Sequence, residues 1–376
     1  MERLSSVLLL LPILFYGLAQ ACQPSALNPD KLGNLYTGRQ AQFPFAFASD
    51  TANCNQDHEE SYSFASQNHE NVASSPDELQ DIPTPLYSIQ PIPSKGLGLI
   101  ALRPIPAGTK ILIESPLLTV SMPEMVEGQG FRINDMVSEI DQKFDLLSPA
   151  QQKEVKDLHD HRFPGDNQSR LLTIFRSNAY NTGDNHVGLF PKTARINHSC
   201  RPNCGNFWSE RSEERVIYAQ REIEEGEEIT VSYIPLLKAV KERQARLQQY
   251  GFVCDCAACQ SEESSKKRVK IGDLLDELEA KAVKSFGGGE KKKKEIYGRL
   301  TGKAEKLVGM MEEEVLGDYL ARAFRLASVF NSRRGNSNVA TEWAKKELEL
   351  HQWADMQSAE TLATTKYLEK LKAGQQ

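Results

Sequence analysis

The chain has 376 residues, of which 40% are hydrophobic and 26% charged, a composition typical of a globular protein with two or three domains. A formal net charge of -6 argues against nucleic acid as the main partner, because a dedicated nucleic-acid binder carries a basic face. The mild acidity favours a basic protein or peptide instead.

An apolar run at the N-terminus, residues 7–19, ends in a small-residue site, Ala-Gln-Ala, at 19–21. This pattern makes residues 1–21 resemble a secretory signal peptide. The run is short for a bilayer and is interrupted by Pro12, so it predicts no transmembrane span. A buried N-terminal helix, or a start codon further downstream, is the alternative interpretation.

Residues 22–84 are polar and show no sustained hydrophobic period. They are rich in Asn, Gln, Ser and acidic residues, and no Lys or Arg lies between Arg39 and Lys95. Such a composition buries too little apolar surface to fold alone, so we expect an acidic disordered linker.

Residues 85–235 have the pattern of a small β-rich domain with a helical insertion at 122–175. Ser148-Pro149 is a typical helix start inside that insertion. Short strands broken by Gly and Pro, together with helices, predict an α+β fold. The predicted strands lie at 87–89, 98–102, 110–115, 117–121, 216–219 and 228–233, and the helical patterns at 136–161 and 171–180.

Residues 263–376 are predicted to form a helical C-terminal domain. Apolar positions at helical spacing mark three amphipathic segments, and residues 287–289, all glycine, separate the first two. Two or three further turns of helix are expected around Trp343 and Trp353. The three segments lie at 271–282, 296–315 and 319–327.

The cysteines are concentrated in one triplet, Cys254, Cys256 and Cys259, within six residues. Thiols this close make strained disulfides, whereas thiolates at this spacing can converge on one tetrahedral zinc ion. Three ligands leave one position, which either water or a distant residue fills. The triplet lies in a predicted zinc segment, 236–262. Cys200, in the sequence Asn-His-Ser-Cys, offers the fourth ligand from outside that segment and would make the site closed and structural.

Six further segments stand out, in order along the chain: SKGLGL at 94–99, RSNAY at 176–180, VGLFP at 187–191, RINHSCRPNC at 195–204, GEEITVSY at 226–233 and YGFVCDC at 250–256. Together they resemble the SET-domain protein lysine methyltransferases that have a Cys-rich post-SET tail, nearest the SET-and-MYND group. One departure is clear: residues 116–175 contain no cysteine, so the MYND zinc finger of that group is absent.

The resemblance implies a SET fold, in which one segment threads under a loop as a pseudoknot, and a protein-lysine N-methyltransferase activity with S-adenosylmethionine as methyl donor. It implies one structural zinc ion and a protein or peptide lysine, histones included, as substrate. We expect a monomer without sequence-specific nucleic-acid binding.

The resemblance also assigns roles to individual residues. Tyr233 matches the catalytic tyrosine, and Tyr180 and Tyr250 match the aromatic walls of the lysine channel. Phe252 matches the ring that packs on adenine. The remaining cofactor-binding residues are Lys95, Gly96, Leu97, Gly98, Asn178, Asn197 and His198, the zinc ligands are Cys200, Cys254, Cys256 and Cys259, and Cys204 has no assigned role.

The chemistry requires a neutral acceptor amine, whereas lysine has a pKa of about 10.4 in water. A tight, desolvating channel lowers that pKa, and alignment of nitrogen, methyl and sulfur supplies much of the rate. Two other classes stay open from the residues alone. One is a non-catalytic, zinc-stabilised SET-like scaffold. The other is a secreted protein in which Cys22 and Cys54 pair.

Two features of the sequence predict different compartments. The N-terminus resembles a secretory signal, yet a site of four thiolates suits a reducing compartment. Asn167 and Asn197 each begin a formal N-glycosylation sequon, and a glycan on Asn197 would block the cofactor pocket. We therefore expect a nuclear or cytoplasmic enzyme, with entry into the secretory pathway as the alternative.

Overall fold

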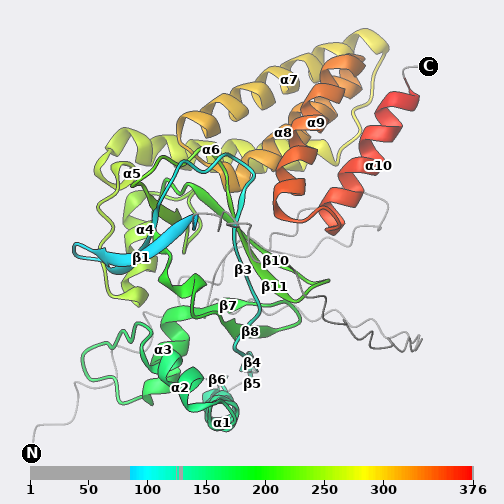
Figure 1. The fold of residues 1–376 in the computed structure, drawn as a ribbon. Coiled ribbons are helices and arrows are strands. Elements are labelled where there is room, and N and C mark those ends of the chain that lie inside the picture. The colour runs from blue at the N-terminus through cyan, green and yellow to red at the C-terminus, as the bar shows by residue number, and fades with distance from the viewer. Residues whose placement is uncertain (1–84, 124, 127–129, 375–376) are drawn as a thin grey trace, which may run out of the picture. The chain divides into compact units, whose positions relative to one another are not determined.

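The computed structural model describes residues 85–123, 125–126 and 130–374 (Figure 1). The signal-like segment and the predicted linker, residues 1–84, lie outside the described residues, as do Cys22 and Cys54. Among the residues that are described, no helix combines the length and hydropathy that crossing a membrane requires.

The first sheet brings together segments that are far apart in the sequence. Its order is β1-β2-β12-β9, formed by Tyr87–Ile92, Gly96–Ala101, Glu228–Val231 and Asn197–His198. Strand β12 runs parallel to β9, where Thr230 lies opposite Asn197 and Val231 opposite His198. The Asn-His motif therefore lies beside the strand that leads to Tyr233. The pseudoknot threading stays a prediction.

Three further sheets complete the β-structure, and the largest two have three strands each. The order β10-β11-β3 joins Cys204–Ser209, Glu214–Ala219 and Lys110–Glu114, and the order β4-β8-β7 joins Leu118–Ser121, His186–Leu189 and Ala179–Asn181. A two-stranded sheet pairs β5 (Met125–Val126) with β6 (Gly130–Phe131). The sequence pattern did not predict β7, β8, β9 or β10, and Tyr180 lies on β7.

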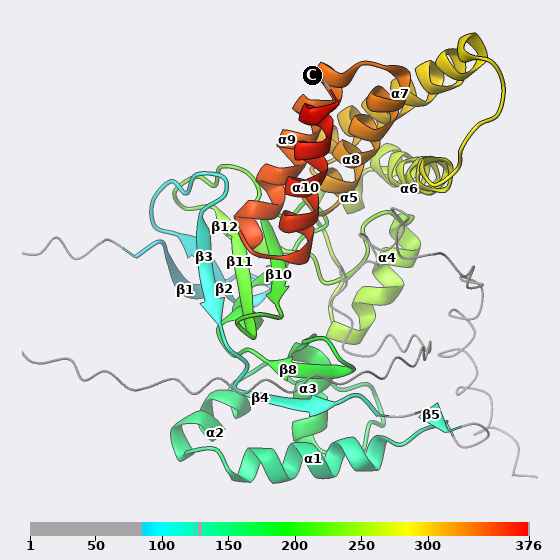
Figure 2. The ribbon, with the colours of Figure 1, turned by 90° about the vertical axis from the view of Figure 1, so that its right-hand side faces the viewer.

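The predicted insertion, 122–175, contains α1 (Ile133–Asp145) and α2 (Pro149–Lys156), while α3 (Arg170–Asn178) begins inside it and ends three residues beyond it. Helix α2 begins where Ser148-Pro149 indicated, because Ser148 and Gln151 form a reciprocal capping box. Helix α1 packs on β4 (Figure 2). The helical pattern of 136–161 ends earlier than predicted, at Lys156, and the following loop extends to Ser169, the N-cap of α3.

The C-terminal region is helical, as predicted. Its last two helices are longer than the expected two or three turns, with 18 residues in α9 and 15 in α10. The buried face of α9 explains the error, because it is lined by Ala340, Ala344 and Glu347 rather than by large apolar residues. The helices are α4 (Val240–Leu247), α5 (Ala257–Gln260), α6 (Glu262–Ala282), α7 (Glu290–Glu313), α8 (Gly317–Arg334), α9 (Ser337–Ala354) and α10 (Ala359–Ala373), with 3-10 turns at Thr193–Arg195 and Gln248–Tyr250.

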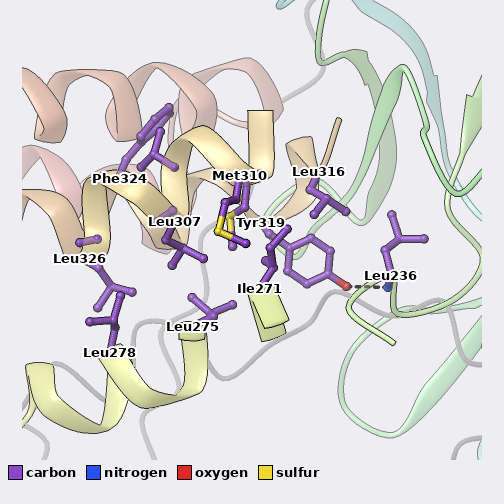
Figure 3. Packing of buried hydrophobic residues seen from close by; sticks show 14 of the residues in the cluster. Leu236, Ile271, Leu275, Leu278, Leu307, Met310, Leu316, Tyr319, Phe324 and Leu326 are labelled. Atoms are coloured by element: carbon purple, nitrogen blue, oxygen red, sulfur yellow. Dashed lines mark hydrogen bonds between the residues drawn. The ribbon is translucent and has the colours of Figure 1, made fainter. Parts of the chain in front are cut away.

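One hydrophobic core is shared by the helices α6, α7 and α8 and the segment that follows β12. Buried side chains from α6, α7 and α8 pack together with Leu236, Tyr250 and Cys254. Figure 3 shows part of this cluster, where the backbone N–H of Leu236 donates to the Tyr319 hydroxyl at 3.0 Å. We name this set of buried residues the shared core.

Candidate active site

A cavity of about 820 Å³ lies where the turn after β1, the end of α3, the Asn-His motif and the post-SET segment meet. Apart from Gly98, every residue that sequence reasoning assigned to the cofactor, the channel or the reaction lines it. Gly98 lies directly behind the wall, since a Cβ there would come within 2.7 Å of Asn197 Nδ2 and 2.6 Å of Ile92 Cγ1. Only glycine lets Asn197 approach this strand.

One carboxylate, Glu228, organises the polar wall of the cavity. The Asn197 amide donates to Glu228 Oε1 at 2.9 Å and to the Leu97 carbonyl at 3.1 Å. Lys95 forms an ion pair with Glu228 Oε2 at 2.7 Å. Sequence reasoning missed Glu228, although it is the second acid of the quoted GEEITVSY motif. The side chain of Lys95 is therefore held by the protein itself.

The imidazole of His198 connects Tyr233 with the cysteines. The backbone N–H of Tyr233 donates to His198 Nδ1 at 3.0 Å. Nδ1 is thus an acceptor, which leaves the proton on Nε2, and Nε2 lies 3.3 Å from Cys200 Sγ. The ring of His198 also lies 5.4 Å from the ring of Tyr233, centroid to centroid. A shift of Cys200 would therefore move His198 and change the position of the Tyr233 backbone.

Three tyrosines, Tyr180, Tyr233 and Tyr250, line the cavity. The rings of Tyr233 and Tyr250 lie 5.0 Å apart, and the Tyr233 hydroxyl donates to the carbonyl of Ile196 at 2.5 Å. Burial, reinforced by Tyr180 and Tyr250, raises the pKa of Tyr233 well above its usual value. Burial likewise raises the pKa values of Tyr180 and Tyr250. All three phenols are therefore neutral at physiological pH.

The loop after α2 holds the post-SET segment in place. His159 Nε2 lies 3.0 Å from the Tyr250 carbonyl, and the Asn178 amide donates to the His159 carbonyl at 2.7 Å. Gly251 has a φ of +82°, and a Cβ there would lie 2.2 Å from the ring of His161. Sequence reasoning missed both histidines, since nothing in the sequence indicates that this loop reaches residue 250.

Four of the described cysteines form one cluster. The Sγ atoms of Cys200, Cys254, Cys256 and Cys259 lie within 4.8 Å of one another, and all four are free thiols. Tetrahedral zinc with Zn–S bonds of about 2.3 Å holds its sulfurs roughly 3.8 Å apart, so the arrangement fits that ion. Cys204, the first residue of β10, lies apart from the cluster and is buried in a hydrophobic core.

The comparisons identify one domain of the protein: residues 96–234 match the family model of the SET domain. Over 192 residues it is 35% identical to the histone-lysine N-methyltransferase set5 of Schizosaccharomyces pombe, covering 51% of this chain and 55% of that protein.

Shorter matches join the chain to other lysine methyltransferases. It is 41% identical over 104 residues to the N-lysine methyltransferase SMYD2 of Gallus gallus, covering 27% of this chain and 23% of that protein. It is 46% identical over 81 residues to the histone-lysine N-methyltransferase ATXR2 of Arabidopsis thaliana, covering 21% of this chain and 17% of that protein. The chain thus spans about half, or less, of the length of these relatives.

Proposed function

We propose that this protein is an S-adenosylmethionine-dependent protein-lysine N-methyltransferase. The observation that carries the proposal is the convergence on one cavity of three tyrosines, two buried and one partly buried, with the Asn-His motif and the aromatic post-SET segment. The three relatives described above are each named as lysine methyltransferases, and these names support the same reaction.

The polar residues of the cavity suit a zwitterionic cofactor, which supplies the methyl group as a sulfonium. The Asn178 amide nitrogen already donates to the carbonyls of His159 and Ile174, each at 2.7 Å. Its oxygen is therefore the atom that would accept a hydrogen bond from the ammonium of the cofactor. Phe252 offers a ring face for adenine, and the backbone at Gly96 to Gly98 permits a close approach.

The role we assign to Tyr233 follows from its neutral phenol. A protonated hydroxyl cannot act as a strong base, so it does not remove the proton from lysine. It orients the amine and the transferring methyl through its dipole, while Tyr180 and Tyr250 exclude water and so disfavour the ammonium form of the substrate.

The cysteine cluster is proposed to hold one structural zinc ion. Four thiolates complete a tetrahedral shell, and a closed shell leaves no position for water or substrate. The metal would fasten Cys200, next to the Asn-His motif, to Cys254 and Cys256 at the edge of the cavity.

The first expected result concerns labelling. Full-length protein incubated with methyl-labelled S-adenosylmethionine and a cell extract should transfer label to lysine side chains of a small number of proteins. Mass spectrometry would identify those lysines, and purified histones would test whether the substrate named for set5 is shared. The protein without extract is the control for self-methylation.

A non-catalytic scaffold is the second candidate, and the same preparation separates the two. Calorimetric titration with the cofactor should show binding near one equivalent. Cofactor binding with no labelled lysine in any extract would favour the scaffold. The absence of both cofactor binding and lysine labelling would contradict the proposed methyltransferase activity. We propose a monomer, which light scattering of the same sample would check.

We further propose that the enzyme works in the nucleus or cytoplasm. Asn197 supports this, because its amide is committed to Glu228 and Leu97 and lines the cavity, where a glycan has no room. A C-terminally tagged chain expressed in cells should show no mobility shift after glycosidase treatment. A shift, together with cleavage after Ala21, would instead establish entry into the secretory pathway.

A further inference from the structure

A buried arginine on β11 has no carboxylate partner among the residues that the structure describes. Arg215 is only 6% exposed, and its guanidinium donates to Asn206 Oδ1 at 3.0 Å and to the carbonyl of Asn181. Its Nε has no hydrogen-bond partner among the described residues. Burial lowers the pKa of Arg215 to about 10, so the group is still charged at neutral pH. An uncompensated buried charge is costly, which makes its position informative.

The guanidinium lies among three aromatic rings. Its carbon is 5.1 Å from the centroid of Tyr180, 5.3 Å from that of Phe190 and 5.6 Å from that of Trp208. Tyr180 lines the cavity, whereas Arg215 does not. The ring of Tyr180 therefore separates a fixed positive charge from the space proposed to receive the substrate lysine.

One carboxylate, Glu114, acts on the same ring as Arg215. Burial raises the pKa of Tyr180, Arg215 lowers it and Glu114 raises it, and the phenol is neutral. Glu114 lies opposite Arg215 in the register of β3 and β11. Its carboxylate accepts from the backbone N–H groups of Lys192 and Thr193 at 2.9 and 2.8 Å and from the Thr193 hydroxyl at 2.7 Å, and makes no ion pair with Arg215 within the described part of the chain. Asn206 and Trp208 on β10 are neutral.

We propose that Arg215 is a positioning residue for methyl transfer, whose buried charge behind Tyr180 favours the neutral form of the substrate amine in the channel. This inference rests on the proposed function. A cation on one face of an aromatic ring also uses the attraction that a second cation on the other face would need. Two effects therefore disfavour an ammonium next to Tyr180. The guanidinium of Arg215 repels it directly, and the same guanidinium already contacts the ring of Tyr180 that would otherwise attract it.

The effect belongs to the bound substrate, and this gives it a distinct kinetic signature. The pH dependence of kcat reports groups in the enzyme–substrate complex, whereas that of kcat/KM reports the free enzyme and free substrate. The guanidinium carbon lies 5.1 Å from the centroid of Tyr180, so an amine on the other side of that ring would lie roughly 10 Å from the charge. At an effective dielectric constant of about 20 to 40, a charge roughly 10 Å away moves a pKa by roughly half to one unit. Removing Arg215 should therefore shift the rising limb of kcat to higher pH and leave the limb of kcat/KM where it is.

The test compares Arg215→Gln and Arg215→Met with the unmodified full-length protein. Single-turnover rates at saturating cofactor and saturating peptide, made around the lysine labelled in the extract, are measured from neutral to alkaline pH. We expect the limb to move up by about half to one pH unit, and the rate at neutral pH to fall roughly three- to tenfold as a result. The position of the limb does not depend on the fraction of folded enzyme, so partial unfolding of a variant does not hide the effect.

Trp208→Leu is the matched control, because it disturbs the same aromatic cage and keeps the charge. We expect it to lower the melting temperature without moving the kcat limb. Equal shifts in Trp208→Leu and Arg215→Gln would assign the effect to packing and overturn the role of Arg215, as would superimposable profiles in all variants. An unmodified protein that labels no lysine would instead overturn the proposed function.

Discussion

Replacing Cys256 by serine should remove the metal and, with it, most of the stability and activity of the protein. We expect the unmodified chain to carry one zinc ion, held by Cys200, Cys254, Cys256 and Cys259, and the variant to carry much less. A serine hydroxyl is a poor zinc ligand, and structural zinc contributes directly to the free energy of folding. Metal analysis and thermal unfolding of the same samples check the prediction.

The loss should extend to the active site through two short connections. His198 Nε2 lies 3.3 Å from Cys200 Sγ, and His198 Nδ1 accepts a hydrogen bond from the backbone N–H of Tyr233. A shift of Cys200 would therefore move the ring of His198 and disturb this hydrogen bond. Cys254 follows Phe252 by two residues, so the post-SET ring would lose its anchor. We therefore expect cofactor affinity and turnover to fall together in the Cys256→Ser protein.

Cys204→Ala is the matched control for this experiment. Cys204 is as deeply buried as Cys200, yet it is not in the cluster. Its loss should lower stability by about 1 kcal/mol, as expected for a small cavity, and leave the zinc content near one. Full zinc occupancy and an unchanged melting temperature in Cys256→Ser would contradict the four-cysteine site.

Replacing Tyr233 by phenylalanine should retain cofactor binding and abolish most turnover. The hydroxyl is proposed to act on the amine and the methyl in the transition state, so kcat falls while affinity changes little. A loss of roughly 100-fold is typical for one well-placed hydrogen-bonding group. Because burial raises the pKa of Tyr233, its ionisation should add no inflection to the kcat profile near neutral pH.

Tyr319→Phe is the comparison for the loss of a buried tyrosine hydroxyl. Tyr319 accepts a hydrogen bond from Leu236 in the shared core and does not line the cavity. It should lower stability by about 1–3 kcal/mol, because a backbone N–H is left unsatisfied, and leave kcat nearly unchanged. An undiminished kcat in Tyr233→Phe would assign Tyr233 to packing.

The sequence predicted those parts of the site that lie within contiguous motifs. Asn197 and His198 share one motif with Cys200, and Phe252 shares another with Cys254. The carboxylate of Glu228 was in a quoted motif without an assigned role, because its two hydrogen-bond partners lie about 30 and 130 residues away. Contacts at that separation depend on the sheet order β1-β2-β12-β9, which no local pattern specifies.

Arg215 was missed although a signal was present. It alternates with Ile217 and Ala219 on β11, and all three are buried, so the period of the strand places an arginine on the core face. The predicted strand began at 216, one residue too late to include it. The extent of α9 was underestimated for a related reason: its buried contact includes an ion pair between Arg325 and Glu347, at 2.8 Å, which hydrophobic spacing cannot detect.

The shared core has a consequence for how the protein comes apart. A chain divided near residue 262 would separate two regions with different sequence textures, yet Leu236, Tyr250 and Cys254 are buried in the same cluster as the helices α6 to α8. Neither region can lose its structure without exposing the apolar surface of the other, so melting should be cooperative across both. We therefore expect the catalytic part and the helical part, which composition separates, to unfold together at this core and not as two independent domains.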